Sequence, residues 1–168
     1  MTRFSTTVEV AASPERVWDA VVDWPAHARW APLTRMRVLG DRPDGVGARF
    51  VARTGIGPLG FDDPMEVTVW QPPADGGPGH WEVVKQGRVV LGRAWFDVVP
   101  AGAGRSTARW DEDVDLAPVR VTRRMAPVLS PVLARMGALL FTLVLRRMAR
   151  EVEGGAPDGP AAGPGRAG

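Results

Sequence analysis

The 168-residue chain contains no cysteine and no tyrosine. Without cysteine it can form neither disulfides nor thiolate metal sites, and this composition fits a reducing compartment. The first five residues, Met1 to Ser5, lack the continuous apolar run of a signal peptide. We therefore expect a cytoplasmic protein.

Lysine is scarce as well, because Lys85 is the only one among 21 basic residues and the others are arginine. With so few groups that titrate at mildly basic pH, a net charge of only +2 gives a sequence pI near 10.3. The high pI is therefore no evidence for nucleic-acid binding.

The positive charge is concentrated near the C-terminus. Residues 117–150 contain no acidic residue and seven arginines: Arg120, Arg123, Arg124, Arg135, Arg146, Arg147 and Arg150. Such a block favours contact with an anionic membrane surface or another partner. Nucleic acid is disfavoured as the partner, because the arginines are interleaved with a broad apolar arc.

Motifs for metal, cofactor or nucleophilic chemistry are missing. The two histidines, His27 and His80, have no His, Cys or carboxylate partner at ligand spacing, and we expect no metal site. The sequence has no phosphate-binding loop, dinucleotide fingerprint or serine nucleophile elbow, and we expect no cofactor.

Alternating apolar residues between glycine and proline clusters predict seven antiparallel strands. These cover residues 4–10, 35–39, 48–54, 61–70, 80–86, 89–99 and 106–116. In the fourth, Pro64 indicates that the regular strand begins at Met65. After the first strand, Ser13-Pro14-Glu15 begins a helix that ends before Pro25, and a second short helix follows at Ala26–Trp30.

One long helix is predicted from Ser130-Pro131 to about Val152, and the sheet must pack against it. Gly154-Gly155 stops it, so residues 1–153 form one domain and 154–168 a disordered Gly/Pro/Ala-rich tail. A helical wheel places an apolar arc opposite Arg135, Thr142, Arg146 and Ala149. The arc contains Leu133, Met136, Gly137, Leu140, Leu143, Val144 and Met148. It is broad enough to line a cavity and also contact a partner.

This α+β order resembles the helix-grip fold of the START-like, Bet v 1-like superfamily of polyketide cyclases/dehydrases and lipid-transport proteins. The resemblance is carried by Val8-Glu9-Val10, Ser13-Pro14-Glu15-Arg16-Val17-Trp18, Asp23, Trp30-Ala31-Pro32, and the hairpin joining Asp97–Pro100 to Ser106–Trp110. It implies a curved seven-stranded sheet around the C-terminal helix, with an apolar pocket between them. Members bind lipids, polyketides or other hydrophobic molecules, and a minority catalyse aromatic ring closure.

Strand alternation selects the residues that face this pocket. Glu112 lies on the apolar face of its strand, between Trp110 and Val114. There it is either an acid/base or ligand-binding group, or a carboxylate that pairs with an arginine or lies near the open rim. The other candidate wall residues, each equally explained by core packing, are Phe50, Met65, Trp81, Phe96, Trp110, Met136 and Leu140. Lys85 is expected towards the mouth.

Three functions remain open from the sequence. The leading one is binding of a hydrophobic small molecule, a lipid or polyketide-like compound, oriented by Glu112 and a rim arginine. The second is a polyketide cyclase or dehydratase that uses Glu112 as acid/base. The third is peripheral membrane or partner binding through the basic C-terminal helix.

Overall fold

The computed structural model describes residues 2–116 and 120–155, with side chains described for these residues except 59, 116 and 120–130. In chain order the elements are β1 (Thr2–Val10), α1 (Pro14–Val22), η1 (Trp24–Ala26), α2 (His27–Trp30), β2 (Thr34–Leu39), β3 (Arg49–Thr54), η2 (Gly57–Leu59), β4 (Phe61–Gln71), β5 (Gly79–Gln86), β6 (Val90–Pro100), β7 (Ser106–Leu116) and α3 (Arg120–Gly154). The predicted helix-grip architecture is confirmed.

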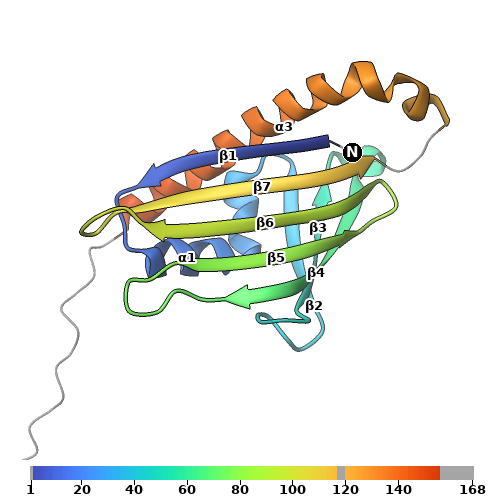
Figure 1. The fold of residues 1–168 in the computed structure, drawn as a ribbon. Coiled ribbons are helices and arrows are strands. Elements are labelled where there is room, and N and C mark those ends of the chain that lie inside the picture. Colours follow the sequence, from blue (N-terminus) through green and yellow to red (C-terminus); the bar gives the residue numbers. More distant parts are fainter. Residues whose placement is uncertain (1, 117–119, 156–168) are drawn as a thin grey trace, which may run out of the picture.

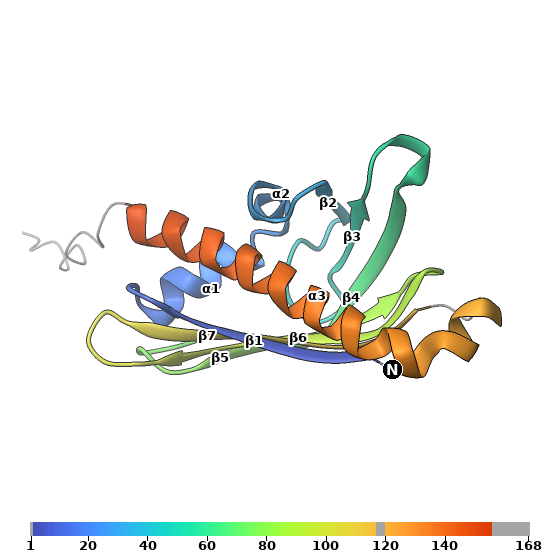
Figure 2. The same ribbon diagram turned by 90° about the horizontal axis from the view of Figure 1, so that it is seen from above.

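The seven strands form one antiparallel sheet in the order β1-β7-β6-β5-β4-β3-β2 (Figure 1). The first strand pairs with the last along its full length, from Thr2 opposite Val114 to Val10 opposite Ser106. Seen from above, the sheet curves and α3 crosses its concave side, with α1 and α2 beside the C-terminal half of that helix (Figure 2). The concave side of the sheet therefore faces α3 (Figure 2).

The two short helices begin where their capping residues predict. The Ser13 side chain accepts a hydrogen bond from the Arg16 amide, and Pro14 opens α1. The Asp23 side chain does the same for Ala26 in η1, whose second residue is Pro25. The chain therefore turns twice within a few residues and carries Trp24 into the interior.

An aromatic cluster forms the centre of the core. The ring of Trp24 stacks on Phe50 at 4.0 Å, and Trp81 lies edge-on to Trp24 at 5.5 Å and to Trp110 at 4.9 Å. Such edge and stacked arrangements are favourable beyond the area that they bury. These rings connect η1 with β3, β5 and β7 on the concave side of the sheet.

Two predicted element boundaries are wrong, and proline is the reason in both. The long helix begins at Arg120, not at Ser130-Pro131, and Figures 1 and 2 show it bending within its first third. Proline removes a backbone hydrogen bond and kinks a helix without always ending it. Strand β4 begins at Phe61, not at Met65. Strand β4 pairs with β5 only from Met65 onward. Among the described strands, Pro64 therefore pairs with β3 only, where it lies opposite Val51.

The rotation of α3 about its axis also differs from the helical wheel. The helix buries Leu145, Met148 and Ala149, although Ala149 was expected on the polar side. Thr142, also assigned to that side, forms a 2.6 Å hydrogen bond between its hydroxyl and that of Thr6 in β1. The predicted tail at 154–168 lies outside the described residues apart from Gly154 and Gly155.

One close contact sets the approach of the helix to the sheet. A Cβ atom added to Gly137 would lie 2.6 Å from the Phe4 ring, so glycine lets α3 come close to β1 at that point. The wheel assigned Gly137 to the buried arc, and its position against β1 agrees with that assignment. Met136, assigned to the same arc, is instead exposed.

Candidate ligand pocket

A cavity of about 360 Å³ lies between the concave face of the sheet, α2 and the middle of α3. Its volume falls in the range of small-molecule binding sites. Most of its wall is apolar, with Phe61, Val83, Phe141 and Val144 among the lining residues. Six of the predicted site residues also line it: Phe50, Met65, Trp81, Trp110, Glu112 and Leu140.

The other two predicted residues lie elsewhere. Phe96 is fully buried and packs its ring against Trp81 at 5.8 Å and Trp110 at 6.1 Å, so it supports two wall residues without lining the cavity itself. Met136 is 61% exposed on the outer side of α3, because of the rotation described above. From this helix the cavity receives Gly137, Leu140, Phe141 and Val144 instead.

A group of charged side chains forms one part of the cavity wall, and three strands supply it. The Lys85 ammonium on β5 lies 2.7 Å from Asp63 Oδ2 on β4 and 3.5 Å from Glu112 Oε1 on β7. All three side chains are at least nine-tenths buried and line the cavity. The partner of Glu112 is therefore a lysine, where the sequence suggested an arginine, and Lys85 is buried in the wall of the cavity. We call Asp63, Lys85 and Glu112 the polar floor.

Strand alternation contained the signal for two members of the polar floor. Asp63 was not among the predicted site residues, and Lys85 was expected at the mouth of the pocket instead of beside Glu112. Asp63 lies two residues before Met65 and Lys85 two residues after Val83, so each shares a face with a predicted inward residue. The β4 assignment that began at Met65 removed Asp63 from consideration.

Burial and pairing act in opposite directions on the charges of the polar floor. Burial raises the pKa of Glu112, although Lys85 and a hydrogen bond from Trp110 Nε1 to Glu112 Oε1 act to lower it. Burial acts to lower the pKa of Lys85, but the nearby Glu112 and Asp63 outweigh it, so that this pKa is raised. The lysine therefore stays charged, and Glu112 holds a proton more readily than an exposed glutamate.

His27 belongs to the wall of the cavity and not to its polar floor. Burial lowers the pKa of His27 to about 4, and its Nε2–H donates a 2.6 Å hydrogen bond to the Val21 carbonyl. Its ring packs near Trp24 and Trp30. A neutral imidazole with a backbone partner serves here as a packing element.

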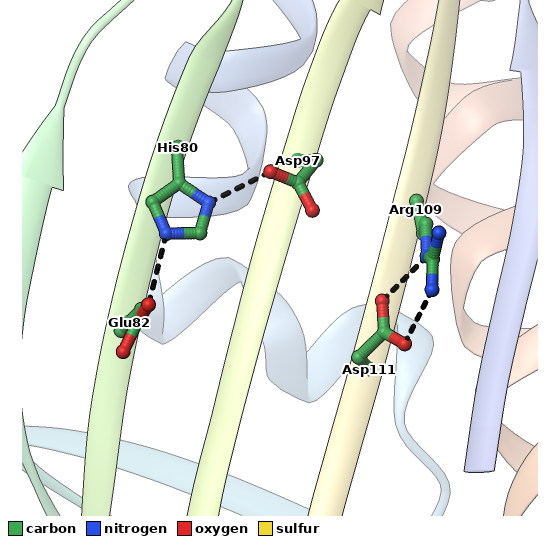
Figure 3. Close-up of polar contacts among 5 residues, drawn as sticks. All are labelled: His80, Glu82, Asp97, Arg109 and Asp111. Carbon is green, nitrogen blue, oxygen red and sulfur yellow. Dashed lines mark hydrogen bonds and ion pairs between the residues drawn. The ribbon is translucent and has the colours of Figure 1, made fainter.

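A second polar group lies on the outer face of the sheet (Figure 3). His80 contacts Asp97 at 2.7 Å through Nδ1 and Glu82 at 3.2 Å through Nε2, and Arg109 binds Asp111 with two hydrogen bonds. Both ring nitrogens of His80 thus have a carboxylate as their partner. Within residues 2–116 and 120–155, no set of three or more His, Asp or Glu side chains is arranged to hold a metal ion.

The basic block is only partly described. Arg135, Arg146, Arg147 and Arg150 belong to the described part of α3, and Arg147 donates a hydrogen bond to the Trp30 carbonyl. The side chains of Arg120, Arg123 and Arg124 lie outside the described set. No helix in the described part of the chain is both long and apolar enough to cross a membrane.

Residues 1–153 match the family model for polyketide cyclase / dehydrase and lipid transport proteins. The chain belongs to this family. The match spans the sheet, the pocket and nearly all of α3, so the polar floor and the apolar wall lie within the family domain. No curated protein has a sequence significantly similar to this chain.

Solved structures share the fold at low sequence identity. A START superfamily protein from Mycobacterium smegmatis superimposes with a TM-score of 0.69 at 22% identity, covering 91% of this chain and 98% of that one. A protein from Thermus thermophilus gives 0.70 at 12% identity, with 89% and 96% covered. The Zhui aromatase/cyclase of Streptomyces sp. R1128 gives 0.58 at 16% identity, with 90% and 96% covered. At these identities the likeness establishes the fold alone.

Replacing the buried lysine should test how strongly the polar floor is coupled. We expect Lys85→Met to lower the free energy of unfolding by about 3 kcal/mol, because it leaves two buried carboxylates without a cation. The control Arg53→Met breaks the exposed Arg53–Asp62 pair, at 2.9 Å, and should cost less than about 1 kcal/mol. Urea denaturation of both variants measures the difference. Equal losses would show that the polar floor is solvated like the surface pair.

Proposed function

We propose that the protein binds a hydrophobic small molecule, a lipid or a polyketide-like compound, in the cavity between the sheet and α3. The observation that carries the proposal is an apolar cavity of about 360 Å³ with charged groups gathered in one part of its wall. Transfer of an apolar ligand from water contributes roughly 25 cal/mol per Å² buried. A cytoplasmic location is part of the proposal, supported by the absence of cysteine.

The comparisons support the same class of ligand. The family is described by polyketide cyclisation, dehydration and lipid transport, all of which involve largely apolar molecules. One structural neighbour is named as an aromatase/cyclase and another as a START superfamily protein. A cavity with charged groups in one part of its wall would hold such a molecule in one orientation, because only one end of the molecule could reach the charged groups.

Filling the cavity should abolish binding. Ala52 lines the cavity from β3, and its neighbour Arg53 is exposed on the same strand. We expect Ala52→Phe to weaken binding of the neutral dye Nile red by about tenfold or more, because the new ring takes up ligand space. Arg53→Phe should leave the affinity unchanged. Fluorescence titration measures both, with circular dichroism to confirm folding; unaltered binding by Ala52→Phe would place the dye elsewhere.

A second candidate is an enzyme of the cyclase or dehydratase type, and the environment of Glu112 favours it. A carboxyl group of raised pKa beside a fixed ammonium suits a general acid. Glu112 would protonate a substrate carbonyl oxygen while an enol carbon of the same chain forms a carbon–carbon bond at that carbonyl carbon. Lys85 would stabilise the resulting Glu112 carboxylate, which then takes up the proton that the enol hydroxyl loses. The new alcohol would leave as water together with a hydrogen from the adjacent carbon.

This candidate predicts a defined pH dependence. With a linear poly-β-keto thioester as substrate, Glu112→Gln should lower kcat/KM by about 100-fold, whereas the control Glu9→Gln, on the outer face of β1, should not. The wild-type rate should fall as the pH rises through the raised pKa of Glu112, since the active form carries the proton. Absorbance of the aromatic product reports the rate. Full activity in Glu112→Gln would exclude the mechanism.

Peripheral membrane contact through the basic helix is a further part of the proposal, and the exposed side of α3 favours it. Met136, at 61%, and Leu139, at 73%, are exposed beside Arg135. Arg146 and Arg150 are exposed further along the helix. Apolar side chains flanked by arginines are typical of surfaces that insert into an anionic interface. The same helix lines the cavity through Leu140, so a docked membrane would lie close to the ligand.

Vesicle co-sedimentation separates the electrostatic contribution of the arginines from the contribution of the exposed apolar side chains. We expect binding to vesicles that contain phosphatidylglycerol, weaker binding at high salt, and little binding to pure phosphatidylcholine. The double change Met136→Ser and Leu139→Ser should weaken binding about tenfold, whereas Val99→Ser, an exposed apolar residue of β6, should not. Equal pelleting with neutral and anionic vesicles would contradict the electrostatic part.

A further inference from the structure

We propose that the polar floor recognises a neutral hydrogen-bond-donating group, an alcohol or phenol hydroxyl, at the buried end of the ligand, and that it excludes carboxylate-headed ligands. The inference rests on the proposed function, because it assigns the chemistry of one end of the molecule bound in the cavity. The inference is based on which hydrogen-bond donors and acceptors of the polar floor already have partners in the protein.

Lys85 Nζ already has three neighbours in the protein. An ammonium group has three N–H bonds. The neighbours of Lys85 Nζ are Asp63 Oδ2 at 2.7 Å, Glu112 Oε1 at 3.5 Å and the sulfur of Met65 at 3.8 Å. The only cation of the polar floor is therefore held by the protein, and a ligand carboxylate would have to displace one of these partners.

An acceptor, in contrast, remains available. Among the described residues nothing donates to Asp63 Oδ1, a buried carboxylate oxygen at the edge of the cavity. The contacts of Glu112 with Trp110 and Lys85 both involve Oε1. Buried polar atoms are normally paired, so the unfilled Asp63 Oδ1 beside this pair points to a donor that arrives with the ligand.

Charge selects against an anion in either protonation state of Glu112. When Glu112 is ionised, the floor carries two carboxylates and one ammonium, and a third carboxylate would be repelled at low dielectric. When Glu112 holds a proton, Asp63 already neutralises Lys85. A hydroxyl is suited to both states, because it can donate to a carboxylate and accept from a carboxylic acid. Trp81 Nε1 is a second buried polar atom without a partner among the described residues.

A matched series of ten-carbon ligands tests the inference by displacement of Nile red. Decanol carries a hydroxyl, decyl methyl ether accepts hydrogen bonds without donating, and decanoate and decylamine carry opposite charges. We expect decanol to bind about tenfold more tightly than the ether and the carboxylate, the effect of one hydrogen bond to a charged group. Equal affinity for decanol and the ether would overturn the inference while the proposed function stands.

Variants at Glu112 locate the recognition. Glu112→Leu should reduce decanol binding to the level of the ether and leave the ether unchanged. Glu112→Gln keeps a hydrogen-bonding amide, so it should retain decanol within about threefold but lose much of the discrimination against decanoate. It also provides the test if Glu112→Leu does not fold. Tightest binding of decylamine or of decanoate would overturn the inference in favour of charge recognition.

The failure of the proposed function has a different signature. If neither Nile red nor any of the four ligands binds, the cavity is not a ligand site and the inference falls with it. If all four ligands bind equally and Ala52→Phe weakens them together, the cavity binds apolar chains and the polar floor has no role in selection.

Discussion

The rest of the site depends on one buried ammonium group. Lys85 holds Asp63 and Glu112 together from three different strands, and each of these charges would be costly to bury alone. Their meeting requires the register and curvature that bring β4, β5 and β7 onto one concave surface. Well-packed apolar residues often stabilise an interior as well as an ion pair does, so stability alone does not explain why charges occupy this floor.

The polar contacts that hold α3 against the rest of the molecule are unevenly distributed along the helix. Near its C-terminus, Glu151 binds the Arg29 guanidinium and Trp30 Nε1, and Arg16 donates to the Val152 carbonyl. These contacts fix α3 to α1 and α2. The middle of the helix instead rests on Phe4 through Gly137 and exposes Leu139. The cavity lies beneath this middle segment, where fewer polar contacts of the described residues hold the helix in place.

The sheet and most of the pocket wall could be predicted from the sequence, because strand alternation and turn residues are short-range signals. They placed Phe50, Trp110 and Glu112 on the inner face, and all three line the cavity. They failed where a long-range contact decides. The wheel put Thr142 on the polar side of α3, but the Thr142 hydroxyl bonds that of Thr6 in β1, a contact that no helical wheel contains. The pairing of Lys85 with Asp63 depends on strand registers that follow only from the assembled sheet.

The two parts of the cavity make unequal contributions to selectivity. An apolar wall distinguishes ligands that differ by one methylene group only weakly, whereas a site that hydrogen-bonds a ligand group strongly rejects an analogue without it. In the proposed function, the wall formed by Phe50, Phe61 and Phe141 would accept many chains, and the choice among them would fall to the polar floor. Within a fold shared at identities of 22% and below, the residues at the positions of Asp63, Lys85 and Glu112 are accordingly where differences in ligand should be sought first.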